Sequence, residues 1–492
     1  MTVHFPFQNT YAALPPNFFA RVAPTPVTSP RLIKLNRALA VHLGLDPELL
    51  ASPEGAEILA GTRLPDGADP IAMAYAGHQF GSFVPQLGDG RAILLGEVID
   101  ADGVRRDIQL KGSGRTPFSR DGDGRAALGP VLREYIVSEA MAALGIPTTR
   151  SLAAVVTGES VMRETALPGA VLTRVASSHI RVGTFQFLAT RGDVGGLRRL
   201  ADHVIARHYP YAANAERPYH ALIEGVIDRQ AELIARWMLI GFIHGVMNTD
   251  NTSISGETID YGPCAFMDQY DPATVFSSID QRGRYAYANQ PPIALWNLVR
   301  FAECLLPLLA NEKEKAIAES KELLDTFVAK FSTIHQAGLR KKIGLFTTRD
   351  DDKALVQDLL DAMAKNQADF TLTFRRLADA ARDPASDGAV RQLFADPTAF
   401  DDWAARWRQR TGSEAQSGEE RRNAMRAVNP AFIPRNHRIE AVIEAAVHRD
   451  DYAPFEELLT VLSKPYDDQP QFAAYAEPPQ PEQRVLQTFC GT

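Results

Sequence analysis

The chain has 492 residues, a formal net charge of −8 and a pI near 5.8. An acidic balance of this kind is not that of a general nucleic-acid binder, which shows a basic face or a high pI, so we expect no nucleic-acid partner. The composition, 45% hydrophobic and 23% charged, is that of an ordinary globular protein. The length allows one large domain or two to three ordinary ones.

The N-terminal stretch lacks the basic and then apolar regions of a secretory signal, and no apolar run reaches the length of about 18 residues that a membrane span needs. Three cysteines, Cys264, Cys304 and Cys490, are too few for a disulfide framework. We therefore expect a cytoplasmic protein with no membrane partner. Cys490, near the chain end, is either an unremarkable tail residue or an accessible redox-active thiol, and both readings stay open.

The first 65 residues are Pro-rich and then helical over 29–44, and they are expected to form an N-terminal extension. Residues 66–185 change texture, with turn signals such as Asp102-Gly103 separating short β-like runs. One helix, expected over 129–145, interrupts them, with Pro130 in its first turn and Gly145 at its end. The four β-like runs are RAILLGEVI, RRDIQLKG, SLAAVVTG and GAVLTRVA.

Residues 186–400 have apolar residues mainly at helical spacing, and 401–492 are expected to be a helical C-terminal extension ending in a Pro- and Gln-rich, extended tail. The expected helices cover 220–247, 292–309, 353–365, 400–410 and 438–447. A short hairpin is expected over 251–262. An α+β fold follows, with a β-rich lobe before a helical lobe. That is the order of a two-lobed, protein-kinase-like fold with nucleotide in the cleft between lobes.

The stretch HGVMNTDNTSISGETIDYGP, residues 244–263, gathers polar side chains directly after a long apolar pattern. Asp250 could accept a proton from an attacking hydroxyl group. Asn251 and Asp260 offer hard oxygen ligands of the kind that Mg²⁺ shares with phosphates and water. The alternative is turn chemistry, because Asn, Asp and Gly dominate turns for backbone reasons.

A second group lies in the β-rich part of the chain. Gly88 and Gly90 sit in a turn whose backbone amides could approach phosphates, and Lys111 ends a later β-like run. Glu134 follows 23 residues after Lys111, on the expected helix, where a kinase places the partner of its strand lysine. Solvated surface charges are the alternative, and Glu139 competes with Glu134 for the lysine.

Arg174 and Arg181 stand seven residues apart in what looks like a strand-turn-strand context, and both could converge on anionic oxygens. Two surface arginines are the more common outcome for such a pair. The kinase pattern is also imperfect. Kinases place the catalytic Asp five residues before the Asn in His-Arg-Asp-x-x-x-x-Asn, whereas Asp250 adjoins Asn251 and no His-Arg-Asp precedes it.

Long motifs carry a more specific signal, and with them the chain closely resembles the selenoprotein O family, also called the protein adenylyltransferase family of that name. They are YAGHQFGSFVPQLGDGRA, LKGSGRTPFSRDGDGRAALG, REYIVSEAMAALGIPTTRSL, HGVMNTDNTSISGETIDYGP and NPAFIPRN. The resemblance implies a kinase-like fold that binds ATP in reverse orientation with Mg²⁺ or Mn²⁺. It also implies that AMP passes to Ser, Thr or Tyr hydroxyls of protein substrates.

Carried over by position, the resemblance implies that Asp250 is the catalytic base, that Asn251 and Asp260 are metal ligands, and that Lys111 contacts phosphate with Glu134 as its ion-pair partner. The implied ATP-binding residues also include Gly88, Gly90, Arg91, Asp123, Gly124, Arg174, Arg181 and Asp260. Cys490 matches the place of the eukaryotic selenocysteine. Two alternatives stay open: a conventional phosphotransferase that moves the γ-phosphate, and a non-catalytic nucleotide-binding pseudokinase scaffold.

Overall fold

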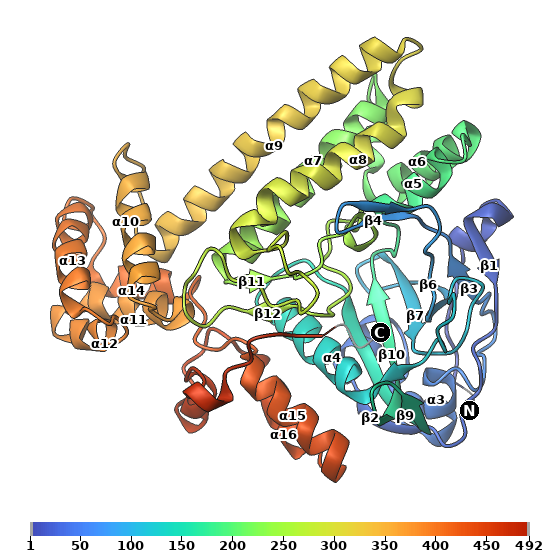
Figure 1. Ribbon diagram of the computed structural model, residues 1–492, viewed down its shortest axis with the longest axis horizontal. Coiled ribbons are helices and arrows are strands. Elements are labelled where there is room, and N and C mark those ends of the chain that lie inside the picture. Colours follow the sequence, from blue (N-terminus) through green and yellow to red (C-terminus); the bar gives the residue numbers. More distant parts are fainter. Residues whose placement is uncertain (1–2, 490–492) are drawn as a thin grey trace.

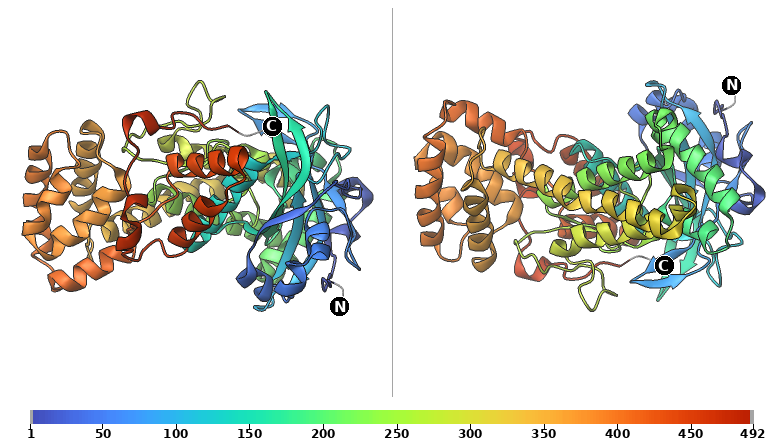
Figure 2. Two further views of the ribbon diagram at one scale, coloured as in Figure 1. Left: turned by 90° about the horizontal axis from the view of Figure 1, so that it is seen from below. Right: turned by 90° about the horizontal axis from the view of Figure 1, so that it is seen from above.

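The computed structural model describes residues 3–489. The chain is α+β, with its main sheet toward one end and a group of helices at the other (Figures 1 and 2). The strands are β1 (Phe19–Arg21), β2 (Arg31–Leu35), β3 (Ile71–Met73), β4 (Gly77–Gln79), β5 (Ser82–Val84), β6 (Ala92–Ile99), β7 (Arg105–Lys111), β8 (Ala126–Ala127), β9 (Arg150–Met162), β10 (Ala166–Ala176), β11 (Phe242–Ile243) and β12 (Ala265–Phe266).

Among the described residues, the main sheet has eight strands in the order β1-β3-β6-β7-β10-β9-β2, with β8 paired to β10. All neighbouring strands are antiparallel. The four β-like runs expected from the sequence are its long strands β6, β7, β9 and β10, so that expectation is confirmed. In the β7–β10 pair, Leu172 lies opposite Lys111 and Arg174 opposite Gln109, which brings the lysine and the arginine to one region of the sheet.

The segment 29–44, expected as one helix, is instead a strand followed by a short helix. β2 pairs with β9 at the edge of the sheet, where its apolar residues Leu32, Ile33 and Leu35 are at least partly buried. The helix α1 starts only at Arg37, where the Asn36 side chain accepts a hydrogen bond from the Leu39 amide at 3.1 Å. β1 and β2 thus form the two edge strands of the sheet.

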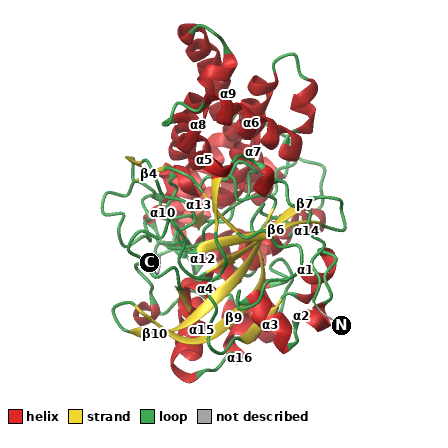
Figure 3. Cartoon of the chain, turned by 90° about the vertical axis from the view of Figure 1, so that its right-hand side faces the viewer, coloured by secondary structure: helices red, strands yellow, loops and turns green. Residues whose placement is uncertain are grey.

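Most of the α-helices fall into three groups (Figure 1), and α5 and α6 lie against α8 (Figure 3). α4 packs on strands β9 and β10, and α15 and α16 cover it; α7, α8 and α9 pack on one another; α10 to α14 gather at the far end. The helices are α1 (Arg37–His42), α2 (Pro47–Leu50), α3 (Pro53–Leu59), α4 (Leu128–Ala143), α5 (Val182–Ala189), α6 (Val194–His208), α7 (Pro218–Leu239), α8 (Gln290–Leu309), α9 (Lys313–Lys342), α10 (Asp352–Lys365), α11 (Phe370–Arg382), α12 (Asp387–Arg391), α13 (Pro397–Thr411), α14 (Gly418–Arg426), α15 (Asn436–Arg449) and α16 (Ala453–Leu462).

Two expectations around the stretch 244–263 need correction. The helix expected over 220–247 stops at Leu239, and β11 and its partner β12 follow. The hairpin expected over 251–262 is absent from these described residues: Ser253 pairs with Arg181 and Thr258 with Thr148. The segment therefore bonds to two distant parts of the chain, a choice that no local pattern specifies.

One helical stretch in the described part of the chain, Tyr287–Leu309, is long and apolar enough by length and composition to cross a membrane. It contains α8, whose residues Leu298, Phe301 and Leu305 are buried among α5, α7 and α9. Half of its apolar window is buried, as in the core helix of a globular protein, so it is weak evidence for a membrane span.

The tail expected to be extended beyond residue 464 is instead a series of turns, with 3₁₀ helices at Pro470–Tyr475 and Pro481–Gln483 and irregular segments between them. Thr488 forms an isolated bridge with Ser277, and its hydroxyl donates to the Pro263 carbonyl at 2.6 Å. Cys264 and Cys304 are buried. Cys490 lies outside the described residues, so its redox role stays a prediction.

Lys342, at the end of α9, gives a test of the helical core. Its ammonium group lies 4.2 Å from the Phe374 ring centroid, and burial lowers its pKa to about 7. The unfolded chain therefore binds more protons than the folded one between pH 7 and 10.5, so this group makes stability rise with pH across that window. Lys342→Met should raise the free energy of unfolding by about 2 kcal/mol at pH 6, and by progressively less toward pH 10.

Urea denaturation at several pH values measures this effect. The exposed neighbour Lys341 supplies the control, since Lys341→Met should leave the pH dependence unchanged. A gain for Lys342→Met that is the same at pH 6 and pH 10 would contradict the assignment.

Candidate active site

A cavity of about 990 Å³ lies between the sheet and the loops around β11 and β12. Polar and charged side chains from distant parts of the chain line it. It is bordered by every candidate site residue among the described ones except Glu134, which stands behind Lys111: Gly88, Gly90, Arg91, Lys111, Asp123, Gly124, Arg174, Arg181, Asp250, Asn251 and Asp260. The structure thus gathers a set that spans 173 sequence positions, 88 to 260, around one space.

Asp260 is held by three cationic side chains. Its Oδ1 accepts from Arg174 at 2.5 Å and lies 3.6 Å from the Lys111 ammonium, and its Oδ2 accepts from Arg181 at 2.5 Å. Burial by itself would raise the pKa of Asp260, but the two arginines and the lysine hold it well below its ordinary value. The carboxylate is therefore ionised. It is also held in a left-handed backbone conformation, with φ of 61°.

Glu134 on α4 completes the charged cluster. Its carboxylate accepts from Lys111 and from Arg174, both at 2.6 Å, so the ion pair expected from chain order is present. Burial favours the neutral acid, yet Arg174 and Lys111 together keep the pKa of Glu134 below its usual range. The competing candidate Glu139 instead pairs with Arg150 at 2.7 Å. Lys111 itself has a lowered pKa, through burial and the adjacent Arg174.

Asp250 has a different environment. It is buried, its Oδ1 has no hydrogen-bond partner, and its Oδ2 receives only a long bond, 3.4 Å, from the Gln79 side chain. Burial raises the pKa of Asp250 to about 6. A carboxylate with that pKa and one unpartnered oxygen is equipped to take a proton near neutral pH.

The metal-ligand candidates Asn251 and Asp260 both border the cavity, and their donor chemistry fits a hard cation. The Asn251 side-chain amide donates to the Val246 carbonyl at 2.9 Å, which orients its oxygen independently of any ligand. Each Asp260 oxygen accepts from one arginine and retains a further lone pair. The residues present therefore fit Mg²⁺ or Mn²⁺, with phosphate and water oxygens completing its coordination.

The two Gly-Asp-Gly motifs meet through the loop that follows β7. At Gly88, where φ is +74°, an added Cβ would lie 2.3 Å from the Phe118 ring. At Gly124, where φ is +69°, an added Cβ would lie 2.1 Å from the Gly114 carbonyl oxygen. Both positions require glycine for backbone conformation and for space. Asp123 accepts from the Arg163 guanidinium at 2.8 Å and so fixes the rim of the cavity.

The arginine pair lies on a strand and a helix, not on strand-turn-strand as expected. Arg174 belongs to β10, whereas Arg181 precedes the first turn of α5, and both are buried. α5 forms there because Thr184 bonds back to the Arg181 amide at 3.1 Å. The two arginines are therefore buried against acidic partners, and the alternative that they are surface residues is excluded.

Sequence reasoning missed several residues that hold the site. Asp89 is buried 3.6 Å from Arg181 and accepts from Gln109, and the Tyr75 ring lies 4.6 Å below the Arg181 guanidinium. Gln79 reaches Asp250 from the β4–β5 hairpin. Asp89 lies between Gly88 and Gly90, which the sequence already marked as a candidate phosphate-binding turn. Its place in that turn was the signal that could have identified it. The others depend on contacts between distant segments.

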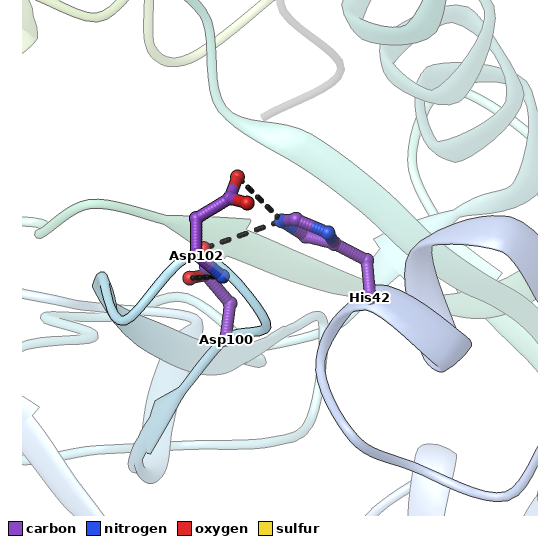
Figure 4. A group of neighbouring side chains, drawn as sticks. All are labelled: His42, Asp100 and Asp102. Atoms are coloured by element: carbon purple, nitrogen blue, oxygen red, sulfur yellow. Dashed lines mark hydrogen bonds and ion pairs between the residues drawn. The ribbon is translucent and has the colours of Figure 1, made fainter.

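A separate acidic group, His42 with Asp100 and Asp102, brings its ligand atoms within 4.8 Å of one another (Figure 4). It lies at the β6–β7 turn and the end of α1, and it contains neither Asn251 nor Asp260. Asp100 already accepts from the amides of residues 102 and 104, at 3.0 and 2.8 Å, and from Arg106 at 2.7 Å. These hydrogen bonds show that Asp100 closes the turn between β6 and β7, which accounts for this group of side chains.

A large polar cavity in which buried cations converge and an unpartnered carboxylate stands beside them is typical of an enzyme that handles phosphorylated substrates. Comparisons with known proteins identify the family. The family model described as "Protein adenylyltransferase SelO" matches residues 2–463. Curated relatives named "Protein nucleotidyltransferase YdiU" match over all 492 residues and over their own full lengths.

Those relatives are 77% identical in Bradyrhizobium diazoefficiens, 75% in Bradyrhizobium sp. (strain ORS 278) and 74% in Rhodopseudomonas palustris (strain BisB5). The chain belongs to the SelO family of protein adenylyltransferases, and the resemblance seen in its motifs is thereby confirmed. It is an enzyme of the nucleotidyltransferase class.

The loop over the cavity gives a second test. Gly124→Ala should lower ATP affinity about tenfold, because the added Cβ meets a carbonyl oxygen at 2.1 Å and the backbone must shift. Isothermal titration with ATP measures the affinity. Gly103→Ala is the matched control: φ there is +78°, but no atom lies within 4 Å of the added Cβ. If both variants bind ATP like the parent chain, the loop does not shape the site.

The charge cluster gives a third test, which needs no catalysis. Asp260→Asn removes the carboxylate shared by three cations, so it should destabilise the protein by about 3 kcal/mol, and pyrophosphate should stabilise this variant more than the parent. Thermal unfolding with and without pyrophosphate measures both effects. Asp250→Asn, which breaks no ion pair, should unfold within about 0.5 kcal/mol of the parent. Equal stability of the two variants would contradict the account of the cluster.

Proposed function

We propose that the enzyme transfers AMP from ATP to Ser, Thr or Tyr hydroxyls of proteins, with ATP bound in an orientation opposite to that of a kinase. The proposal includes a two-lobed, protein-kinase-like architecture: an N-terminal extension, 1–65; a β-rich lobe, 66–185; a helical lobe, 186–400; and a C-terminal extension, 401–492. The names of the relatives support nucleotide transfer. The cavity's charge distribution supports the finer statement.

The single observation that carries the proposal is the convergence of Lys111, Arg174 and Arg181 on Asp260, next to Asp250. Guanidinium forks match the oxygen geometry of phosphates, and a lysine adds a compact positive charge. Two carboxylates, Asp260 and Glu134, pair with these three cations and leave the cluster with a formal net charge of +1. This excess of positive charge favours the entry of a polyphosphate, which would share the cations with those carboxylates.

The position of Arg181 favours the reversed orientation. The same guanidinium group donates to the Asp260 carboxylate at 2.5 Å and to the Asp250 backbone carbonyl at 2.7 Å. If Arg181 and its neighbouring cations hold the β- and γ-phosphates, these phosphates occupy the inner part of the cavity. The α-phosphate would then lie beside the carboxylate of Asp250. The cations would also offset the charge that grows on pyrophosphate as it departs, where electrostatic stabilisation has most effect.

The step balances as a nucleotidyl transfer. Asp250 takes the proton of the acceptor hydroxyl, whose oxygen forms a bond to the α-phosphorus. The bond from the α-phosphorus to the oxygen that bridges to the β-phosphate breaks, and pyrophosphate leaves against the three cations. The raised pKa of Asp250 suits it to carry that proton. Lys111 would hold the phosphates in place, and Glu134 would hold Lys111 in place.

Asn251 and Asp260 would hold Mg²⁺ or Mn²⁺, which supplies charge neutralisation at the phosphates when bound. The fit of their oxygens to such an ion supports this part of the proposal.

Two other functions use the same residues. A conventional phosphotransferase would place the γ-phosphorus beside Asp250, and a pseudokinase scaffold would bind ATP without turnover. The relatives' names disfavour the scaffold. The arginines at the cavity floor disfavour the kinase, because its leaving group, ADP, would lie toward the rim.

Incubation with ATP labelled at the α- or the γ-phosphorus separates the three functions. We expect the α-label on protein and an intact-mass increase equal to AMP, with an absolute requirement for a divalent cation. Asp250→Asn should reduce transfer at least about 100-fold, since general-base assistance is worth that much. Retention of the γ-label would identify an ordinary kinase. Neither label on any protein of a bacterial lysate would favour the scaffold.

A further inference from the structure

The outer side of the proposed catalytic loop carries the β4–β5 hairpin. The His78 amide donates to the Thr249 hydroxyl at 2.7 Å, and the Phe80 amide donates to the Asn248 side chain at 3.0 Å. Gln79 reaches the Asp250 carboxylate. The hairpin is thus bonded to residues 248, 249 and 250 in turn. A molecule that presents a hydroxyl to Asp250 must pass close to this hairpin.

Beside the hairpin, two arginines share one indole ring. The Arg284 guanidinium lies 4.9 Å from the Trp296 ring centroid, and Arg300 lies 5.1 Å from it. The His78 ring meets Trp296 edge-on at 5.1 Å. Phe83, which is exposed, packs 4.9 Å from His78. We call these five side chains the Trp296 patch.

The patch reaches the tip of the hairpin. A Cβ built on Gly81 would lie 3.6 Å from the central carbon of the Arg284 guanidinium. Tyr285, the next residue, donates its hydroxyl to the Asn248 side chain at 2.6 Å. Both sides of the patch are therefore anchored to the same loop that carries the base.

The positive charge of the patch is only partly compensated. Among residues 3–489, no carboxylate lies within ion-pair distance of Arg284, and its Nε is inaccessible and unpartnered. The nearby Asp280 accepts from the amides of Arg284 and Tyr285, so its oxygens are used by the backbone. Arg300 pairs with Glu303 at 2.6 Å, and its Nε is likewise unpartnered. Stacking on the indole holds both guanidinium groups in position before any partner arrives.

We infer that the Trp296 patch binds an acidic segment of the acceptor protein, next to the hydroxyl that is modified. The inference rests on the proposed transfer to protein hydroxyls and names the substrate class. Guanidinium groups fixed on an aromatic ring present donors that suit carboxylates, and the exposed Phe83 adds apolar contact. The chain as a whole carries a net charge of −8. A locally cationic patch on an acidic protein therefore selects the direction from which an acidic segment approaches.

Binding of three labelled peptides tests the inference. Each peptide carries one threonine, flanked on both sides by glutamates, by glutamines or by lysines, and its affinity is measured by fluorescence anisotropy without ATP. The parent chain should bind the glutamate peptide about tenfold more tightly than the glutamine peptide, and less so as salt is added. The double variant Arg284→Gln, Arg300→Gln should bring this ratio close to one. The double variant Arg284→Glu, Arg300→Glu should prefer the lysine peptide.

The exposed Arg199 on α6, which is not part of the patch, gives the matched control: Arg199→Gln should keep the parent's ratio. The ratio compares two peptides on one protein, so a general loss of folding or activity does not imitate the effect. Equal binding of the three peptides to the parent chain overturns the inference. So does an unchanged ratio in the glutamine double variant.

Intact-mass analysis of the same peptides after incubation with ATP separates this inference from the proposed function. AMP added preferentially to the glutamate peptide supports both. Phosphate added with the same preference would remove the proposed function and keep the acidic substrate class. AMP added equally to all three peptides would keep the function and remove the inference. If no peptide is modified, the binding ratios still decide the inference.

Discussion

The site depends on one partly buried carboxylate, that of Asp260. Asp260 stands in a left-handed backbone conformation and forms ion pairs with two buried arginines and with the partly buried Lys111. Burying three cations is costly unless anions accompany them. Asp260 and Glu134 meet that requirement in the folded chain. Their presence lets the cations stay charged and in position, ready for oxygen ligands of another molecule.

The fold brings these charges together through register. Alternate residues of a strand point to the same face, so Gln109 and Lys111 share a face of β7, and Leu172 and Arg174 share one of β10. Arg174 lies opposite Gln109 and bonds to it at 3.4 Å, which leaves Lys111 diagonally beside the arginine. α4 then brings Glu134 over both. Arg181 arrives from the start of α5, where Asp89 and Tyr75 support it.

Two regions of positive charge thus face the proposed base from different directions on an acidic molecule. The cations that line the cavity are largely buried and pair with two carboxylates, which suits the binding of a polyanion. The Trp296 patch is partly exposed and its arginines rest on an aromatic ring, which suits weaker contacts with a segment that comes and goes. Asp250, with its unpartnered oxygen, lies where the two meet.

The sequence by itself determined the α+β class, the four long strands of the sheet, the family and some of the helices, among them α4, α8 and α10, because periodicity and long motifs are local properties of the chain. It also paired Lys111 with Glu134 from chain order alone. It placed no separate helix at α5, α6, α9 or α11. It misjudged 29–44 and 251–262, since strand pairing with distant segments decided both. Only the tertiary structure decided that Arg174 and Arg181 are buried rather than on the surface. Only the tertiary structure showed that the site is supported by Asp89, Tyr75 and Gln79. Each depends on burial and on contacts between residues far apart in the chain, whose energies appear only when the whole sheet and the loops around it are assembled.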